Sequence, residues 1–319
     1  MKLPQNFTRK SFAVIGFSVA IYAAVALYFG FDEISSQLKG FPARSLWLLA
    51  GLSMVNYCLR FWRWEIYLRR LGHPLPLGKS LGLYFSTYVM VITPGKIGEI
   101  FKAGILRERF GISLSVGIPI VVAERIYDFL AVLVLAVCGV FFWPGSLTGM
   151  TTGLAASAGI PVLLFLFQNK TVRTKLLSKV SASKLLARHK LGIDDSLESL
   201  ARLMTPSQMA FSLGLSVLAW VCECLGLWLV CRELGFPVPV FESIFIYAAG
   251  TLVGSLSFLP GGLGGTEATL IWLLGSLGMA GVMSATAALL IRLFTLWLAV
   301  VLGLVVFMFW RRDLLSPPE

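Results

Sequence analysis

The sequence predicts an all-α membrane protein that crosses the bilayer several times and is built from two inverted repeats. The 319 residues are 57% hydrophobic and 13% charged, with a mean hydropathy of +0.83, as is typical of polytopic membrane proteins. Long apolar runs alternate with short polar loops, and a Pro-Gly break recurs at Pro94 and Pro260. We expect a single transmembrane domain, 1–319, of about six full spans plus two re-entrant helical hairpins.

The first half of the chain contains four long apolar runs and two short segments between them. In order, these are Ser11–Gly30, Ser45–Leu68, Ser80–Thr93, Gly95–Arg109, Ser113–Trp143 and Leu147–Phe167. The run at 80–93 is too short to cross a hydrocarbon core of about 30 Å. The run at 95–109 is too charged to face lipid. Together they are predicted to form a hairpin that enters and leaves the membrane on one side, with the Pro-Gly break at its tip.

The second half repeats this layout after a polar, basic stretch at 168–207, which is predicted to be a cytoplasmic surface loop. Its apolar segments are Gln208–Cys231, Ser243–Leu259, Leu263–Leu277 and Ala280–Trp310. The two middle segments flank the second Pro-Gly break and are predicted to form the second hairpin. Pro-Gly breaks at membrane depth are tolerated where protein or a water-filled cavity surrounds them.

The distribution of Lys and Arg predicts the orientation. With the N-terminus in the cytoplasm, three of the 27 basic residues (Lys39, Arg44 and Arg232) fall in outer loops. Six lie within membrane segments, which leaves 18 for the inner loops. This bias satisfies the positive-inside rule. Ten full crossings, in which both hairpins cross completely, would keep much of the same bias and remain an alternative.

An internal repeat extends beyond the Pro-Gly breaks. Leu71, Gly72, Pro74 and Pro76 match residues 163 positions later, Pro94 matches Pro260, and Arg125 matches Arg292. The predicted repeats cover about 45–143 and 208–310 and enter the membrane from opposite sides. Inverted repeats with broken helices are typical of transporters that bind substrate near the midplane. The alternative is that the Leu-Gly-x-Pro-x-Pro segments are merely two similar turns.

The membrane segments carry six bases and six acids, which suggests pairing inside a cavity. The candidate substrate-binding residues are Lys96, Glu99, Lys102, Glu124, Arg125, Asp128, Glu223, Glu267, Arg292, Arg60 and Arg63. The candidate hairpin-tip residues are Pro94, Gly95, Gly98, Pro260, Gly261, Gly262, Gly264 and Gly265.

The stretch beside the first Pro-Gly break predicts an anion site. Lys96 and Lys102 flank Glu99 at helical spacing, and a helix start adds backbone N–H donors suited to a phosphate. Arg60 occupies the same repeat position as Glu223 with opposite charge, which suggests a pair across the repeat axis.

Structural roles are the alternatives for several of these residues. Arg60 and Arg63 would snorkel to a membrane face. Glu124, Arg125 and Asp128 would form a buried network, and the glycines of the second tip would permit close helix packing.

Signatures of enzymes and of metal sites are missing from the sequence. There is no phosphate-binding Gly-x-x-x-x-Gly-Lys motif, no His-Glu-x-x-His and no Gly-x-Ser-x-Gly. The five cysteines lie in or beside apolar runs without metal-like spacing to the two histidines. We therefore expect no catalytic activity, metal or cofactor. The net charge of +11 is explained by cytoplasmic loops, so no nucleic-acid partner is expected.

Three motifs together carry a resemblance to a known family. They are Thr93-Pro94-Gly95-Lys96-Ile97-Gly98-Glu99, then Ala123-Glu124-Arg125-Ile126-Tyr127-Asp128, then Leu259-Pro260-Gly261-Gly262-Leu263-Gly264-Gly265-Thr266-Glu267. The chain resembles the lysylphosphatidylglycerol synthase transmembrane family, the flippase-like region of bacterial multiple peptide resistance factors. The aminoacyl-transfer domain of those factors is absent from this sequence.

The resemblance implies a flippase that moves a phosphate-bearing lipid between leaflets of a bacterial cytoplasmic (inner) membrane. Anionic membrane lipids are the expected partners, together with a lipid synthase or a glycosyltransferase. The alternatives are ion- or proton-coupled transport of a soluble solute, and a scaffold that handles lipid without transporting it. The oligomeric state is left open.

Overall fold

The computed structural model describes residues 20, 22–24, 27–93, 97–143 and 190–315. Most of the predicted first span, the predicted span at 147–167 and the tip residues Pro94, Gly95 and Lys96 therefore lie outside the described residues. Every regular element within the described residues is a helix. The predicted all-α architecture is confirmed for this part of the chain.

The elements of the first half follow the predicted segments to within a few residues, apart from α2, which forms a helix in the stretch 31–44 where a short polar loop was expected. They are α2 (Phe31–Lys39), α3 (Ala43–Arg70), α4 (Leu77–Ser86), the 3-10 helices η1 (Thr87–Ile92) and η2 (Ile97–Ile100), α5 (Phe101–Phe110) and α6 (Leu114–Val140). The hairpin segment before the first Pro-Gly break thus tightens from an α-helix into a 3-10 turn. The segment after the break begins with such a turn.

The second half shows the same order of elements. They are α9 (Lys190–Leu203), α10 (Pro206–Glu233), α11 (Val240–Leu256), α12 (Gly265–Ser276), α13 (Gly281–Arg292), the π-helix η4 (Leu293–Trp297) and α14 (Leu298–Leu315). Of these, α10 and the continuous segment Gly281–Trp310 are long and apolar enough to cross a membrane. The predicted surface loop at 168–207 needs a correction, because its last part folds into α9 and packs against α6.

The turns that end α3 and α10 have the same hydrogen bonds. Gly72 and Gly235 take φ of 82° and 85°, a left-handed conformation that suits glycine. The next residue in each turn donates its N–H five residues back, His73 to the Leu68 carbonyl and Phe236 to the Cys231 carbonyl. A proline then precedes the following helix in both cases. The two Leu-Gly-x-Pro-x-Pro turns therefore match in structure as well as in sequence.

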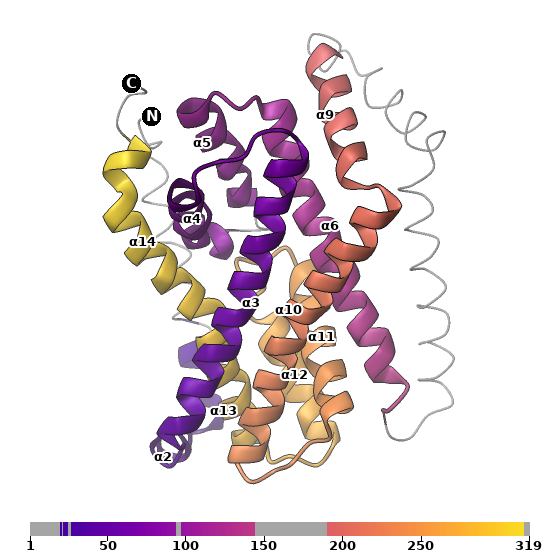
Figure 1. Cartoon of the computed structure of the whole chain (residues 1–319). Coiled ribbons are helices and arrows are strands. Elements are labelled where there is room, and N and C mark those ends of the chain that lie inside the picture. Colours follow the sequence, from indigo (N-terminus) through magenta and orange to yellow (C-terminus); the bar gives the residue numbers. More distant parts are fainter. Residues whose placement is uncertain (1–19, 21, 25–26, 94–96, 144–189, 316–319) are drawn as a thin grey trace.

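Helices α3 and α10 pack side by side along the middle of the molecule and run in opposite directions (Figure 1). Where they cross, the Asn56 side-chain N–H group donates to the Ala219 carbonyl at 2.8 Å. These two residues are 163 positions apart, which is the repeat offset. Equivalent residues that touch each other lie beside a twofold axis.

The two short-helix pairs lie toward opposite ends of this central pair (Figure 1). Helices α4 and α5 lie toward the end that carries α9, whereas α11 and α12 lie toward the end that carries α2. Each long helix packs on the hairpin of the other half, α14 on α4 and η1, and α6 on α11.

Glycines let the long helices approach the hairpins closely. A Cβ atom at Gly303 would lie 2.6 Å from the Val89 amide nitrogen, and one at Gly139 would lie 2.7 Å from that of Phe245. The two halves are therefore interlocked. The membrane-plane orientation of the repeat axis and the re-entrant nature of the hairpins stay predictions.

Candidate functional site

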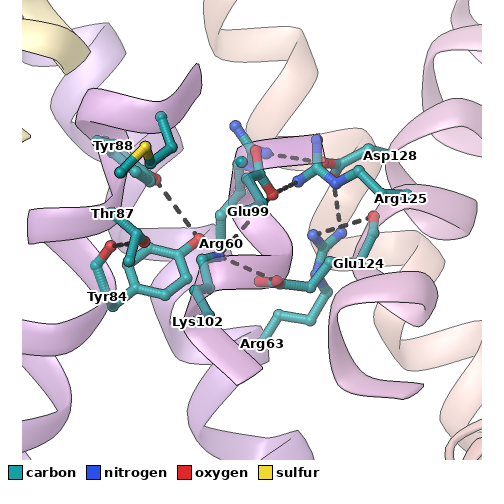
Figure 2. A network of polar contacts seen from close by, with 12 residues as sticks. Arg60, Arg63, Tyr84, Thr87, Tyr88, Glu99, Lys102, Glu124, Arg125 and Asp128 are labelled. Atoms are coloured by element: carbon teal, nitrogen blue, oxygen red, sulfur yellow. Dashed lines mark hydrogen bonds and ion pairs between the residues drawn. The ribbon is translucent and has the colours of Figure 1, made fainter. Parts of the chain in front are cut away.

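Asp128 on α6 forms ion pairs with three arginines (Figure 2). Arg60 and Arg63 reach it from α3 at 2.7 and 2.9 Å, and Arg125 reaches it from one turn earlier on α6 at 2.9 Å. Arg63 is almost fully buried, at 1% exposure, and also contacts the Ser216 hydroxyl. The two α3 arginines are thus bound internally rather than snorkelling to a membrane face.

Glu99 lies in η2, at the start of the second arm of the first hairpin, and it joins this group of charges to a lysine. Its carboxylate lies 3.0 Å from Arg125 and 4.0 Å from Lys102. Lys102 in turn pairs with Glu124 at 3.1 Å. The Lys102 ammonium also faces the rings of Tyr84 and Trp64, at 4.4 and 5.3 Å from their centroids, which is cation–π geometry.

The second half has its own buried ion pair, between Arg292 and Glu267. The Arg292 Nε atom donates to Glu267 at 2.8 Å, and a terminal nitrogen donates to the Gly261 carbonyl in the Pro-Gly tip at 2.5 Å. The other Glu267 oxygen accepts the Gly264 N–H at the start of α12. The tip backbone and the ion pair therefore hold each other in place.

Glu223 on α10 accepts a hydrogen bond from the Tyr247 hydroxyl on α11 at 2.5 Å. Its repeat equivalent, Arg60, forms an ion pair with Asp128. Both side chains face the same cavity. The predicted pair between Arg60 and Glu223 across the repeat axis stays a prediction.

A cavity of about 290 Å³ lies between the two halves of the molecule. Arg60, Arg125 and Arg292 line it together with the acids Asp128 and Glu223. Its wall also includes Thr93, just before the first Pro-Gly break, and Phe258, Leu259, Gly261 and Gly262 around the second break. The second tip and the residue just before the first Pro-Gly break therefore reach one chamber, to which the first half contributes two arginines and the second half one.

The remaining predicted site residues fall into three groups: side chains behind the cavity wall, glycines of the two tips, and residues outside the described part of the chain. Arg63, Glu99, Lys102, Glu124 and Glu267 support the cavity-lining residues but are not part of its lining. Gly98 donates its N–H to the Thr93 hydroxyl, and Gly261 and Gly262 line the chamber, whereas Gly264 and Gly265 begin α12. Pro94, Gly95 and Lys96 are the predicted tip and site residues whose positions are not described.

Aromatic residues of the cavity were missed in the sequence. Tyr57, Tyr88, Trp220 and Tyr247 line the chamber, and the Tyr57 hydroxyl bonds to the carbonyls of Phe294 and Thr295 in the π-helix. A π-helix displaces the regular helical hydrogen bonds, and such segments are frequent at functional sites. The signal was available, because Tyr57 and Trp220 occupy equivalent repeat positions, as do Tyr84 and Tyr247.

The charges balance across the whole described network but not at the cavity wall. Arg60, Arg63, Lys102, Arg125 and Arg292 face an equal number of acids, Glu99, Glu124, Asp128, Glu223 and Glu267. The wall itself has three arginines against two acids. Arg125 is the most exposed cation of the first-half cluster, at 26%. The chamber therefore offers guanidinium groups to an anionic or phosphate-bearing ligand.

The comparison with protein families decides the classification. The family described as the lysylphosphatidylglycerol synthase TM region matches residues 14–303. The chain belongs to this family. Both Pro-Gly breaks and every charged residue of the site lie within the matched range.

Related members of the lysylphosphatidylglycerol synthase TM family include archaeal proteins described as UPF0104 membrane proteins. One from Methanothermobacter thermautotrophicus is 37% identical over 89 residues, which are 28% of this chain and 27% of that relative. Another from the same organism is 22% identical over 321 residues, covering 92% of this chain and 94% of the relative. The protein MJ1078 of Methanocaldococcus jannaschii is 23% identical over 238 residues, covering 73% of this chain and 98% of the relative. These relatives, with the apolar helices, identify a membrane protein.

Proposed function

We propose that this protein is a lipid translocase that moves a phosphate-bearing lipid between the leaflets of the cell's cytoplasmic membrane without covalent chemistry. The observation that carries the proposal is the cavity between the two halves, whose wall contains three arginines, Thr93 just before the first Pro-Gly break, and the second hairpin tip. Five charged side chains around one cavity in an apolar helical bundle are costly unless a polar ligand or water uses the cavity. Family membership supports the same class of substrate.

The ion pairs around Asp128 suggest how a phosphate would be held. Three arginines share this one carboxylate. An entering phosphate competes with Asp128 for Arg60 and Arg125, which line the cavity, while Arg63 behind the wall keeps Asp128 paired. Arg292 approaches from the other half. Arg60 and Arg125 thus exchange one anionic partner, Asp128, for another, the phosphate. No guanidinium is left without a counter-charge.

The repeat suggests how the headgroup would pass. The antiparallel packing of α3 and α10, and the contact between the equivalent residues Asn56 and Ala219, support two copies related by a twofold axis in the membrane plane. In that arrangement each re-entrant hairpin closes the chamber from one side. Opening one hairpin at a time would give the headgroup access from alternate leaflets, while the acyl chains remain in lipid.

A transport assay tests the proposal. Fluorescent phosphatidylglycerol is placed in the inner leaflet of liposomes, and a quencher is added outside. The lipid should become accessible to the quencher faster in liposomes that contain the protein. Protein-free liposomes, and liposomes with an unrelated helical membrane protein, are the controls. Wild-type protein that leaves lipid movement at the protein-free rate would contradict translocation. Such a result would favour a lipid-handling scaffold that serves a lipid synthase or glycosyltransferase, or a carrier of soluble solutes, which uptake of radiolabelled anions would detect.

The orientation that we propose places the N-terminus, α9 and the first hairpin in the cytoplasm. Toward the end of the bundle that carries α9, α3 ends with Arg69 and Arg70, and α4 and α5 contain Lys79, Arg107 and Arg109. At the opposite end, Lys39 belongs to α2, Arg44 to the start of α3 and Arg232 to the last turn of α10. This asymmetry follows the positive-inside rule. A cysteine replacing the exposed Ser36 on α2 should react with an impermeant thiol reagent in intact cells, and one replacing Asp195 on α9 only after permeabilisation. The unsubstituted chain measures the background from its own cysteines, and the reverse pattern would overturn the orientation.

A further inference from the structure

A second, apolar cavity of about 670 Å³ lies on the outside of the second half. We call it the tail groove. Its walls come from the N-terminal segment, from α2, and from α13 with η4, and they include Leu27, Phe31, Leu38, Leu289, Leu293 and Trp297. Several of these side chains are strongly exposed, including Leu27, Phe31 and Leu293. The lining is apolar apart from Tyr22, Ser35 and Trp297.

The tail groove shares a wall with the polar chamber. Trp297 donates its indole N–H to the Tyr22 hydroxyl at 2.8 Å, and that hydroxyl donates to Glu267 at 3.5 Å. Glu267 is the carboxylate that holds Arg292, which faces the chamber. The aromatic rings of Tyr22 and Trp297 meet edge to face and line the groove. The groove side of this shared wall is therefore apolar, and the chamber side carries the charged Arg292.

We propose that the tail groove binds an acyl chain of the lipid whose headgroup occupies the chamber, with Tyr22 and Trp297 as the gate between the two compartments. The inference rests on the proposed translocase function and adds the site for the tail. An apolar groove joined through an amphipathic aromatic wall to an arginine-lined chamber matches a ligand with a hydrocarbon tail and an anionic head. A polar ligand would leave its hydrogen-bonding groups unsatisfied in this lining.

The test uses phosphatidylglycerol with a photoreactive diazirine in its acyl chain, added in trace amounts to phosphatidylcholine liposomes that contain the full-length protein. Mass spectrometry should locate crosslinks on the groove segments 27–38 and 289–297. Unlabelled phosphatidylglycerol should suppress these crosslinks at a lower mole fraction than it suppresses crosslinks on the lipid-facing side of α14. Equal suppression at both places would mean that bulk lipid alone enters the groove, and would overturn the proposal.

Filling the groove gives an independent readout. Leu293→Trp, at a half-exposed position, should reduce both the groove crosslinks and lipid movement about tenfold, the order expected if the indole displaces about two methylene groups of the chain. Ala23→Phe fills the groove from the opposite wall and should act in the same way. Leu304→Trp is the matched control, because Leu304 is similarly exposed on α14, and should change neither quantity.

The outcomes separate this inference from the proposed function. If wild-type protein moves no lipid, the translocase itself is wrong. If wild-type protein moves lipid and both groove-filling variants do so at the same rate, the chamber is used without the tail groove. If both variants fold and both lose transport and groove crosslinks, the tail site is supported.

Discussion

Arg125→Ala should lower the rate of lipid movement in liposomes about tenfold or more. Arg125 lines the chamber and is its most accessible first-half cation. Losing one charge-assisted hydrogen bond to a phosphate costs about 1.5–3 kcal/mol, which corresponds to a factor of ten or more. The measurement is the initial rate of fluorescent phosphatidylglycerol movement at matched protein incorporation.

The structure also changes the expected effect of this substitution on folding. On α6 alone, removal of Arg125 would leave Glu124 and Asp128 as neighbouring like charges. In the folded protein Asp128 keeps Arg60 and Arg63, and Glu124 keeps Lys102. Arg125→Ala should therefore remain folded, with Glu99 still near Lys102.

A charge-preserving variant is the control for this prediction. Arg125→Lys keeps the positive charge but loses the planar fork that binds two phosphate oxygens at once. It should transport at an intermediate rate. A folded Arg125→Ala protein with wild-type transport would contradict the phosphate site, because no other cation of the first-half cluster is as accessible from the chamber among the described residues.

The sequence predicted the elements well because membrane helices obey simple rules. Apolar length, charges and Pro-Gly breaks set the helix bounds, and the paired Leu-Gly-x-Pro-x-Pro turns located the repeat. The helix α2 was not predicted, and neither was α9, whose polar, basic stretch contains no long apolar run. The helix α9 becomes favourable through packing against α6, with the Tyr127 hydroxyl donating to the Leu203 carbonyl.

The candidate site was predicted as a set of residues but not as an arrangement. Unpaired charges are costly in a membrane, so a search for charged residues in apolar segments found every ion-paired side chain of the network. Sequence spacing could not tell which of them line the chamber. Lys102 and Arg60 illustrate the difference: Lys102 turns toward Trp64 and Tyr84 behind the wall, while Arg60 reaches the cavity. That choice depends on how α3, α5 and α6 pack, which is a tertiary property.

Lys102→Met should be the most destabilising single change in the charge network. Lys102 is 2% exposed, and its ammonium nitrogen lies 3.1 Å from the carboxylate of Glu124. This ion pair compensates the charge of a carboxylate that is fully buried. Removing one partner of a buried pair typically costs about 3–5 kcal/mol. The methionine side chain fills the lysine stem's place beside the two aromatic rings, so the loss of charge, rather than a packing defect, should dominate. Thermal unfolding in detergent micelles measures the effect.

The double variant Lys102→Met with Glu124→Gln provides the decisive comparison. It removes both charges of the pair, leaves Glu99 with Arg125, and should recover most of the lost stability, since the buried carboxylate is no longer unpaired. If Lys102 acts only behind the chamber wall, the recovered protein should also move lipid at close to the wild-type rate. A double variant that is stable but inactive would instead place Lys102 in direct contact with the passing headgroup, as the charge pattern beside the first Pro-Gly break predicted. A double variant no more stable than the single one would mean that the buried Glu124 carboxylate is not what destabilises Lys102→Met.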